Sequence, residues 1–144
     1  MYNEKSRSID AYLACPYTHH DESVSIKRFS EVTKMAAWMT KMGICVFSPI
    51  THSHIMAQAY KLPTTWEFWG PIDRCHMDAC KVLLVYMLDG YESSIGVTSE
   101  IQHARKTGMP IIMFKNKLDF IKQAKEIECL RDKIKKAKNL LKYL

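Results

Sequence analysis

The chain is poor in residues that break or cross-link a polypeptide, and it has no long apolar run. Only 5 of its 144 residues are Gly, 5 are Pro and 5 are Cys. These low counts exclude a low-complexity chain. The cysteines form no CxxC pair, so we expect reduced thiols and no zinc site. No apolar stretch approaches the roughly 20 residues that span a bilayer, and residues 1–10 are polar. We therefore expect a cytoplasmic protein without a secretory signal or a membrane partner.

The net charge of +6 is confined to one end of the chain. Residues 1–114 contain 11 Lys/Arg and 11 Asp/Glu, whereas residues 115–144 contain 10 and 4. In the second segment, apolar residues recur at helical spacing, with lysines opposite them. The stripe consists of Ile134, Ala137, Leu140, Leu141 and Leu144. This pattern predicts a helix docked on the body with solvated lysines, and nucleic acid is not the expected partner.

Apolar segments of strand type alternate with segments of helical type. The expected strands are 9–15, 44–47, 82–88 and 110–114, and the expected helices are 23–42, 65–80, 94–107 and 118 onward. Residues 55–60 are expected to form a helical turn. Such alternation predicts an α/β fold: a single-domain, open parallel sheet of Rossmann-like type with helices on both faces. We expect one domain over 1–144, with a core at 9–114 and a basic helical extension at 115–144.

An open parallel sheet binds ligands beyond the carboxyl ends of its strands. Three loops lie there in the predicted fold, at 15–21, 48–54 and 89–96. The third loop leads into a helix and carries Ser93, Ser94 and Gly96. A serine hydroxyl, free backbone N–H groups and the positive end of a helix dipole together favour an anion such as phosphate. Glu100 follows one helical turn later, so a carboxylate is expected beside this anion site.

Three groups of residues carry a resemblance to a known family. They are YLACPYTH at 12–19, the pair Asp73 and Asp78, and the run Ser94-x-Gly96-Val97-x-x-Glu100. Together they resemble the nucleoside 2-deoxyribosyltransferase-like superfamily, over about residues 9–114. The Ser-x-Gly-Val-x-x-Glu form is most similar to the nucleoside 5′-monophosphate N-glycosidases, because the deoxyribosyltransferases tend to carry Asp at the position of Ser94.

The resemblance implies a chemistry for two carboxyl groups. N-glycosidic cleavage passes through an oxocarbenium-like state, which a carboxylate can stabilise or attack. By resemblance, Glu100 is the nucleophile and Asp73 protonates the leaving base. An exposed helix residue is the structural alternative for each of them. The resemblance also implies an enzyme that needs no cofactor and that forms a homodimer or a larger homo-oligomer.

Other polar and aromatic residues are candidates for binding a nucleotide or nucleoside. They are Tyr12, Tyr17, His19, His52 and Trp69. Tyr12 can equally be a core residue, and Trp69 can belong to the core or to a subunit interface. His52 and His54 would share a face of an extended chain and could contribute to a metal site. Two histidines do not make such a site, and glycosidic cleavage needs no metal, so we expect none.

The sequence therefore predicts a hydrolase that cleaves the N-glycosidic bond of (deoxy)nucleoside 5′-monophosphates. Transfer of the deoxyribosyl group to a second base is the alternative within the same chemistry. A nucleotide-binding sensor without turnover, and an interaction protein that acts through the lysine-rich helix, are alternatives from other classes.

Overall fold

The computed structural model describes the backbone of residues 2–141 and the side chains of residues 2–138. Its centre is a sheet of parallel strands in the order β2-β1-β3-β4. The strands are β1 (Ile9–Ala14), β2 (Val46–Phe47), β3 (Cys80–Tyr86) and β4 (Ile111–Phe114). The predicted α/β class and open parallel sheet are confirmed. Because β2 and β3 flank β1 on opposite sides, the strand order reverses between β1 and β3, which is where such sheets bind ligands.

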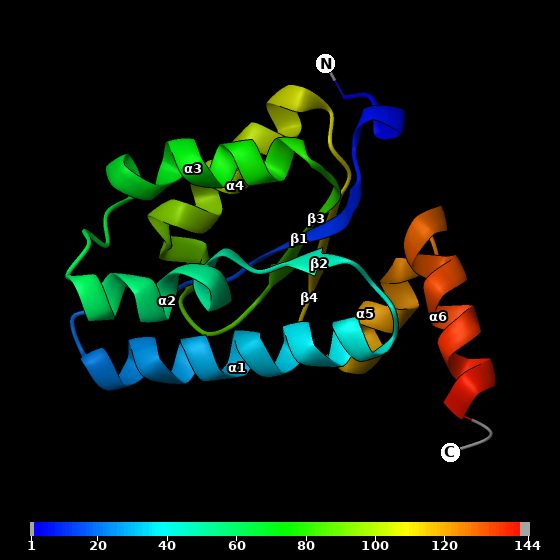
Figure 1. Ribbon diagram of the computed structural model, residues 1–144, viewed down its shortest axis with the longest axis horizontal. Helices are drawn as coiled ribbons and strands as arrows, with labels where there is room; N and C mark the ends of the chain where they lie inside the picture. Colours follow the sequence, from blue (N-terminus) through cyan, green and yellow to red (C-terminus); the bar gives the residue numbers. More distant parts are fainter. Residues whose placement is uncertain (1, 142–144) are drawn as a thin grey trace.

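Helices cover both faces of the sheet (Figure 1). They are α1 (Glu22–Lys41), α2 (Pro49–Tyr60), α3 (Trp66–Asp78), α4 (Ile95–Thr107), α5 (Lys117–Ala124) and α6 (Glu128–Leu141). Alternate residues of β1 point to opposite faces, as the pleat of a strand requires. Ala11 and Leu13 pack in the core that contains α1 and α5, whereas Tyr12 and Ala14 pack in the core that contains α3 and α4.

The second predicted loop is the main point at which the expected fold was wrong. Residues 48–54 are not an extended loop, because α2 begins at Pro49. Ser48 is the N-cap, and its side chain accepts a hydrogen bond from the Thr51 N–H. Ser at the N-cap followed by Pro at the first helical position strongly favours the start of a helix, even though this segment contains few apolar residues. On a helix, His52 and His54 no longer share a face.

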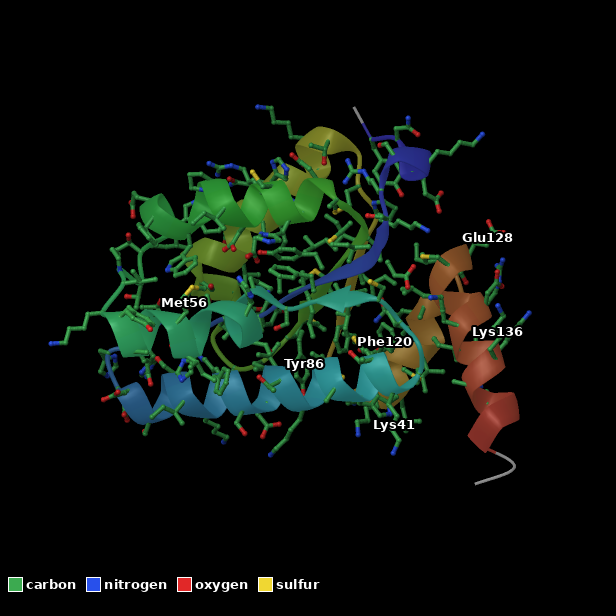
Figure 2. All side chains as sticks on the ribbon, viewed as in Figure 1. Lys41, Met56, Tyr86, Phe120, Glu128 and Lys136 are labelled. Atoms are coloured by element: carbon green, nitrogen blue, oxygen red, sulfur yellow. The ribbon has the colours of Figure 1, made fainter. Side chains whose placement is uncertain are left out.

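The basic C-terminal segment forms two helices, and the second is anchored to the body. Lys133 of α6 lies 3.2 Å from a carboxylate oxygen of Asp10, a buried residue near the start of β1. On the same helix, Leu130, Ile134 and Ala137 are buried, whereas Lys136 points away from the body (Figure 2). The docked helix with solvated lysines is thus confirmed as far as residue 138. Leu140, Leu141 and Leu144 of the predicted stripe lie outside the side chains that the structure describes.

No helix between residues 2 and 141 combines the length and the apolar character that crossing a bilayer requires.

Candidate active site

A cavity of about 380 Å³ lies at the carboxyl ends of β1 and β3. Its walls come from the segment after β1, from α2, from the start of α3 and from the start of α4. Seven of the residues singled out in the sequence line it: Tyr17, Trp69, Asp73, Ser93, Ser94, Gly96 and Glu100. The fold therefore brings together residues that are up to 83 positions apart in the chain, from Tyr17 to Glu100.

Glu100 is the most buried carboxyl group of the cavity. The residue is 5% exposed, and Tyr12, which is fully buried on β1, donates a hydrogen bond of 2.9 Å to Glu100 Oε1. Burial raises the pKa of Glu100 to about 8; the charge of Asp73 adds to this shift and the bond from Tyr12 opposes it. Tyr12 itself does not line the cavity. It fixes one oxygen of Glu100 from behind, so Tyr12 positions the carboxyl group.

Asp73 supplies a second carboxyl group from the facing helix α3. Burial raises the pKa of Asp73 to about 7. Asp78, which is five residues further on, points elsewhere: its carboxylate lies 2.8 Å from His103 Nε2 on α4. Asp73 and Glu100 therefore line one cavity and titrate as an interacting pair, while Asp78 connects α3 to α4.

The start of α4 has the features of an anion site. Ser94 is the N-cap residue, and its hydroxyl accepts a hydrogen bond of 3.3 Å from the Val97 N–H. Ser93 ends the preceding 3₁₀ turn, Tyr91–Ser93. A Cβ built on Gly96 would be no closer than 3.9 Å to its nearest neighbours. The packing of the chain itself therefore does not require glycine at this position, which leaves approach of a ligand as a reason for it.

His54, rather than His52, is connected to the cavity. The Tyr17 hydroxyl is hydrogen-bonded to His54 Nδ1, and the His54 ring stacks on Phe29 at 4.0 Å. His54 is buried, and this burial lowers its pKa, which favours the neutral ring beside the Tyr17 hydroxyl. His52 instead contacts Phe47, outside the cavity. The sequence interpretation considered His54 only as a possible metal ligand, because it placed residues 48–54 in a loop.

His19, like His52, lies apart from the main cavity. His19 lines a second hollow of about 200 Å³, which shares Tyr17 and Thr18 with the cavity. The rings of His52 and His54 have separate surroundings on α2. Among the side chains of residues 2–138, no three His, Cys, Asp or Glu residues lie in an arrangement that could hold a metal ion.

Arg28 holds two of the loops at the cavity in place. From α1 its guanidinium donates to the carbonyl oxygen of Asp89 at 2.8 Å and to that of Thr18 at 3.2 Å. The first carbonyl belongs to the loop after β3 and the second to the loop after β1. Nothing in the sequence around Arg28 indicates this role, because the contact with Asp89 spans 61 residues.

The contact of Arg28 with the loop after β3 can be tested at Gly90. Gly90 has a φ of +90°, and a Cβ there would lie 2.5 Å from Arg28 Nη2. Gly43, with a φ of +81°, is the matched control, because its Cβ would come no closer than 4.0 Å to any neighbour. We expect Gly90→Ala to lower the free energy of unfolding in urea by about 1 kcal/mol more than Gly43→Ala does, since only Gly90→Ala also displaces Arg28. Equal losses would contradict the role given to Arg28.

The carboxyl groups that line the cavity are not balanced by any basic residue among the described side chains. Glu67, Asp73 and Glu100 supply carboxyl groups. Within the described side chains, no Lys, Arg or His lines the same cavity. An anionic group would therefore depend on serine hydroxyls, backbone N–H groups and the α4 dipole.

The fold and this cavity define a single-domain, Rossmann-like α/β protein with a ligand cavity where the strand order reverses. Residues 9–116 match the model of a family described as a domain of unknown function (DUF1937), and the chain belongs to this family. A comparison with curated proteins found no match.

Proposed function

We propose that the protein cleaves the N-glycosidic bond of nucleoside 5′-monophosphates, with Glu100 as the nucleophile. The observation that carries the proposal is the pair of carboxyl groups, Glu100 and Asp73, in one cavity beside a helix N-terminus. A sensor without turnover would not need two carboxyl groups with raised pKa values in the same cavity. The resemblance to the nucleoside 2-deoxyribosyltransferase-like superfamily supports the same assignment of roles.

In the proposed reaction, the carboxyl groups have opposite protonation states. Ionised Glu100 attacks the anomeric carbon, while neutral Asp73 gives its proton to the departing base. Because the pKa of Glu100 (about 8) is higher than that of Asp73 (about 7), this reactive state is the less populated of the two singly protonated forms of the pair. The bond from Tyr12 holds Oε1 of Glu100 and leaves Oε2 to attack. Water then attacks the anomeric carbon of the glycosyl ester, which frees the sugar phosphate and restores Glu100. A nucleotide panel with chromatography of the free base tests this activity, and release of no base from any nucleotide or nucleoside would refute it.

The phosphate is proposed to bind at Ser94. We expect Ser94→Ala to lower kcat/KM for a nucleotide about tenfold or more and to leave the value for the matching nucleoside nearly unchanged, because a hydrogen bond to a charged group contributes roughly 1.5–3 kcal/mol. Asn116→Ala is the control: Asn116 is the N-cap of α5, accepts a bond from the Asp119 N–H and does not line the cavity. It should lower stability without changing the preference for nucleotides.

Deoxyribosyl transfer between nucleosides is a second candidate, and the acidic lining favours it. A neutral 5′-hydroxyl is easier to place among three carboxyl groups than a phosphate dianion is. In that reaction a second base replaces water as the acceptor of the glycosyl group. Equal kcat/KM values for nucleoside and nucleotide, together with base exchange when a second base is added, would support transfer over hydrolysis.

The protein is further proposed to form a homo-oligomer. Phe68, Ile72 and Ile95 are 38%, 39% and 71% exposed, and they belong to the two helices, α3 and α4, that carry Asp73 and Glu100. Burial of such residues against a second copy would remove apolar surface from water. Sedimentation velocity of the intact chain tests the oligomeric state.

A further inference from the structure

The acidic lining of the cavity is accompanied by an aromatic wall. Trp66 and Trp69, at the start of α3, line the cavity together with the three carboxyl groups. Trp69 and Asp73 are four residues apart, so they occupy the same face of the helix one turn apart. An aromatic surface directly above a carboxyl group is suited to a ring that carries positive charge, because the ring can stack while the charge faces the carboxylate and the indole face.

Both indoles are held in place by their surroundings. The Trp69 N–H donates a hydrogen bond of 2.6 Å to the carbonyl oxygen of Pro63. The Trp66 ring lies against Gly70, where a Cβ would come within 2.8 Å of Trp66 Cε2. Only glycine leaves room for the ring in this position. The aromatic wall is therefore preformed, which lowers the cost of ordering it around a ligand.

Glu100 presents a further carboxyl group to the same cavity. The residue is 5% exposed and lines the cavity, and its Oε1 accepts the bond from Tyr12. Among the described side chains, no buried nitrogen or oxygen atom lacks a hydrogen-bond partner. Because Glu100 lines the cavity and Tyr12 binds only Oε1, the other oxygen is available to a ligand in the cavity.

We infer that the cavity binds the aromatic ring of its substrate as a cation, and that N-glycosides of permanently charged aromatic rings, such as N-alkylated pyridinium rings, are its preferred ligands and substrates. This inference rests on the proposed function and specifies its substrate class. Asp73 and Glu67 attract the positive charge of the ring, and Trp69 stacks on its face. Binding of an uncharged ring would also remove water from these carboxyl groups, but no electrostatic attraction would offset that cost.

Cleavage of an N-glycoside with a cationic ring needs no proton from Asp73. Glu100 forms a C–O bond to the anomeric carbon as the C–N bond breaks, and the electron pair of that bond neutralises the ring nitrogen. The base leaves as a neutral molecule. Water then adds to the anomeric carbon, Glu100 is released, and one proton passes to solvent. A cationic substrate thus yields sugar phosphate, neutral base and one proton.

Binding to the intact protein can be measured with aromatic rings that carry no sugar. The probes are 1-methylnicotinamide, which is cationic, and nicotinamide, which is neutral and nearly the same shape. We expect calorimetry to give a Kd at least about tenfold lower for the cation. Quenching of tryptophan fluorescence should accompany binding, and Trp38→Phe should preserve most of it, because Trp38 packs on Phe120 away from the cavity.

Variants on one helix separate the proposed site from a general charge effect. Asp73→Asn and Trp69→Leu should each reduce the preference for the cation at least about fivefold. Asp78→Asn, which removes the same charge from the same helix outside the cavity, should leave the preference unchanged. Equal affinities for the two probes in the unaltered protein, or an equal loss in Asp73→Asn and Asp78→Asn, would overturn the inference.

Turnover distinguishes this inference from the proposed function. The substrates are nicotinamide mononucleotide and its uncharged 1,4-dihydro form, and the readouts are free base and proton release. Preferential cleavage of the charged form supports both proposals. Binding of the cation without cleavage of any nucleotide leaves the cation site standing and refutes the hydrolase. Cleavage of neutral nucleotides without any preference for the cationic ring keeps the hydrolase and refutes the inference.

Discussion

Glu100→Gln is expected to lower kcat for nucleotide cleavage at least about 10³-fold while nucleotide affinity is retained. Glutamine keeps the shape of the side chain and can still accept the bond from Tyr12, which lies 2.9 Å from Glu100 Oε1. It lacks the negative charge that attacks the anomeric carbon and stabilises the oxocarbenium-like state. Chromatography of the released base measures kcat, and calorimetry with the uncleaved nucleotide measures affinity.

The same variant has a stability signature that reports whether it is folded. Burial raises the pKa of Glu100 to about 8, so the folded state disfavours the ionised form. The free energy of unfolding of the unaltered protein should therefore fall as the pH rises above the pKa that a carboxyl group has in the unfolded chain, up to and beyond pH 8. Glu100→Gln has no carboxyl group at this position, so it should not show this fall. At pH 9 we expect Glu100→Gln to be more stable in urea by the order of 1–4 kcal/mol. A variant that is folded, more stable at pH 9 and still active at near the original rate would rule out Glu100 as the nucleophile.

Asp73→Asn is expected to lower kcat/KM about 10²- to 10⁴-fold for nucleotides with a neutral base, because it removes the proton donor to the leaving group. Turnover of the unaltered protein should rise as Glu100 ionises and fall as Asp73 loses its proton. With pKa values of about 8 and about 7, the coupled pair gives a bell-shaped profile with its maximum between them. Asp73→Asn should abolish the alkaline fall and leave a single rise at the pKa of Glu100, at a higher pH than the rise in the unaltered protein, because in the unaltered pair the first proton leaves mainly from Asp73.

Substrates with different leaving bases show whether Asp73→Asn impairs turnover by removing a proton donor or by disturbing the structure. For a base that departs without protonation, the effect of Asp73→Asn on kcat should be small. Asp78→Asn, which breaks the contact with His103, should affect both kinds of substrate equally. A loss in Asp73→Asn that does not depend on the leaving base would contradict its role as the acid.

Most of the fold can be predicted from local sequence patterns. The buried strands and the helices between them were predictable because apolar periodicity and caps such as Ser94 and Gly108 act within a few residues. The start of α2 is not predicted correctly because Ser48-Pro49 can end a strand as well as begin a helix, and only the first of these possibilities fits a loop over 48–54. That error also displaced His54, since the face on which a side chain lies depends on whether its segment is extended or helical.

The site was predictable only where a motif lay on one segment. Ser94, Gly96 and Glu100 belong to one helix start, so their proximity follows from local structure. The bond between Tyr12 and Glu100 spans 88 residues, and the contact of Arg28 with Asp89 spans 61. Such contacts depend on strand order and on side-chain packing, which no short pattern contains. The pKa values depend in turn on that burial.

The position of α6 affects how charged molecules approach the cavity. Lys133 is docked on Asp10 near the start of β1, whereas Cys15, just beyond the end of this strand, lines the cavity. Five residues of strand correspond to roughly 16 Å, which exceeds the screening length of about 8 Å at physiological ionic strength. At about 0.01 M salt the screening length reaches about 30 Å, and the net charge of +6 acts on every approaching ion. Added salt should therefore speed the encounter of a cation with the acidic cavity and slow that of an anion, as the distant lysines are screened and the nearby carboxylates are not.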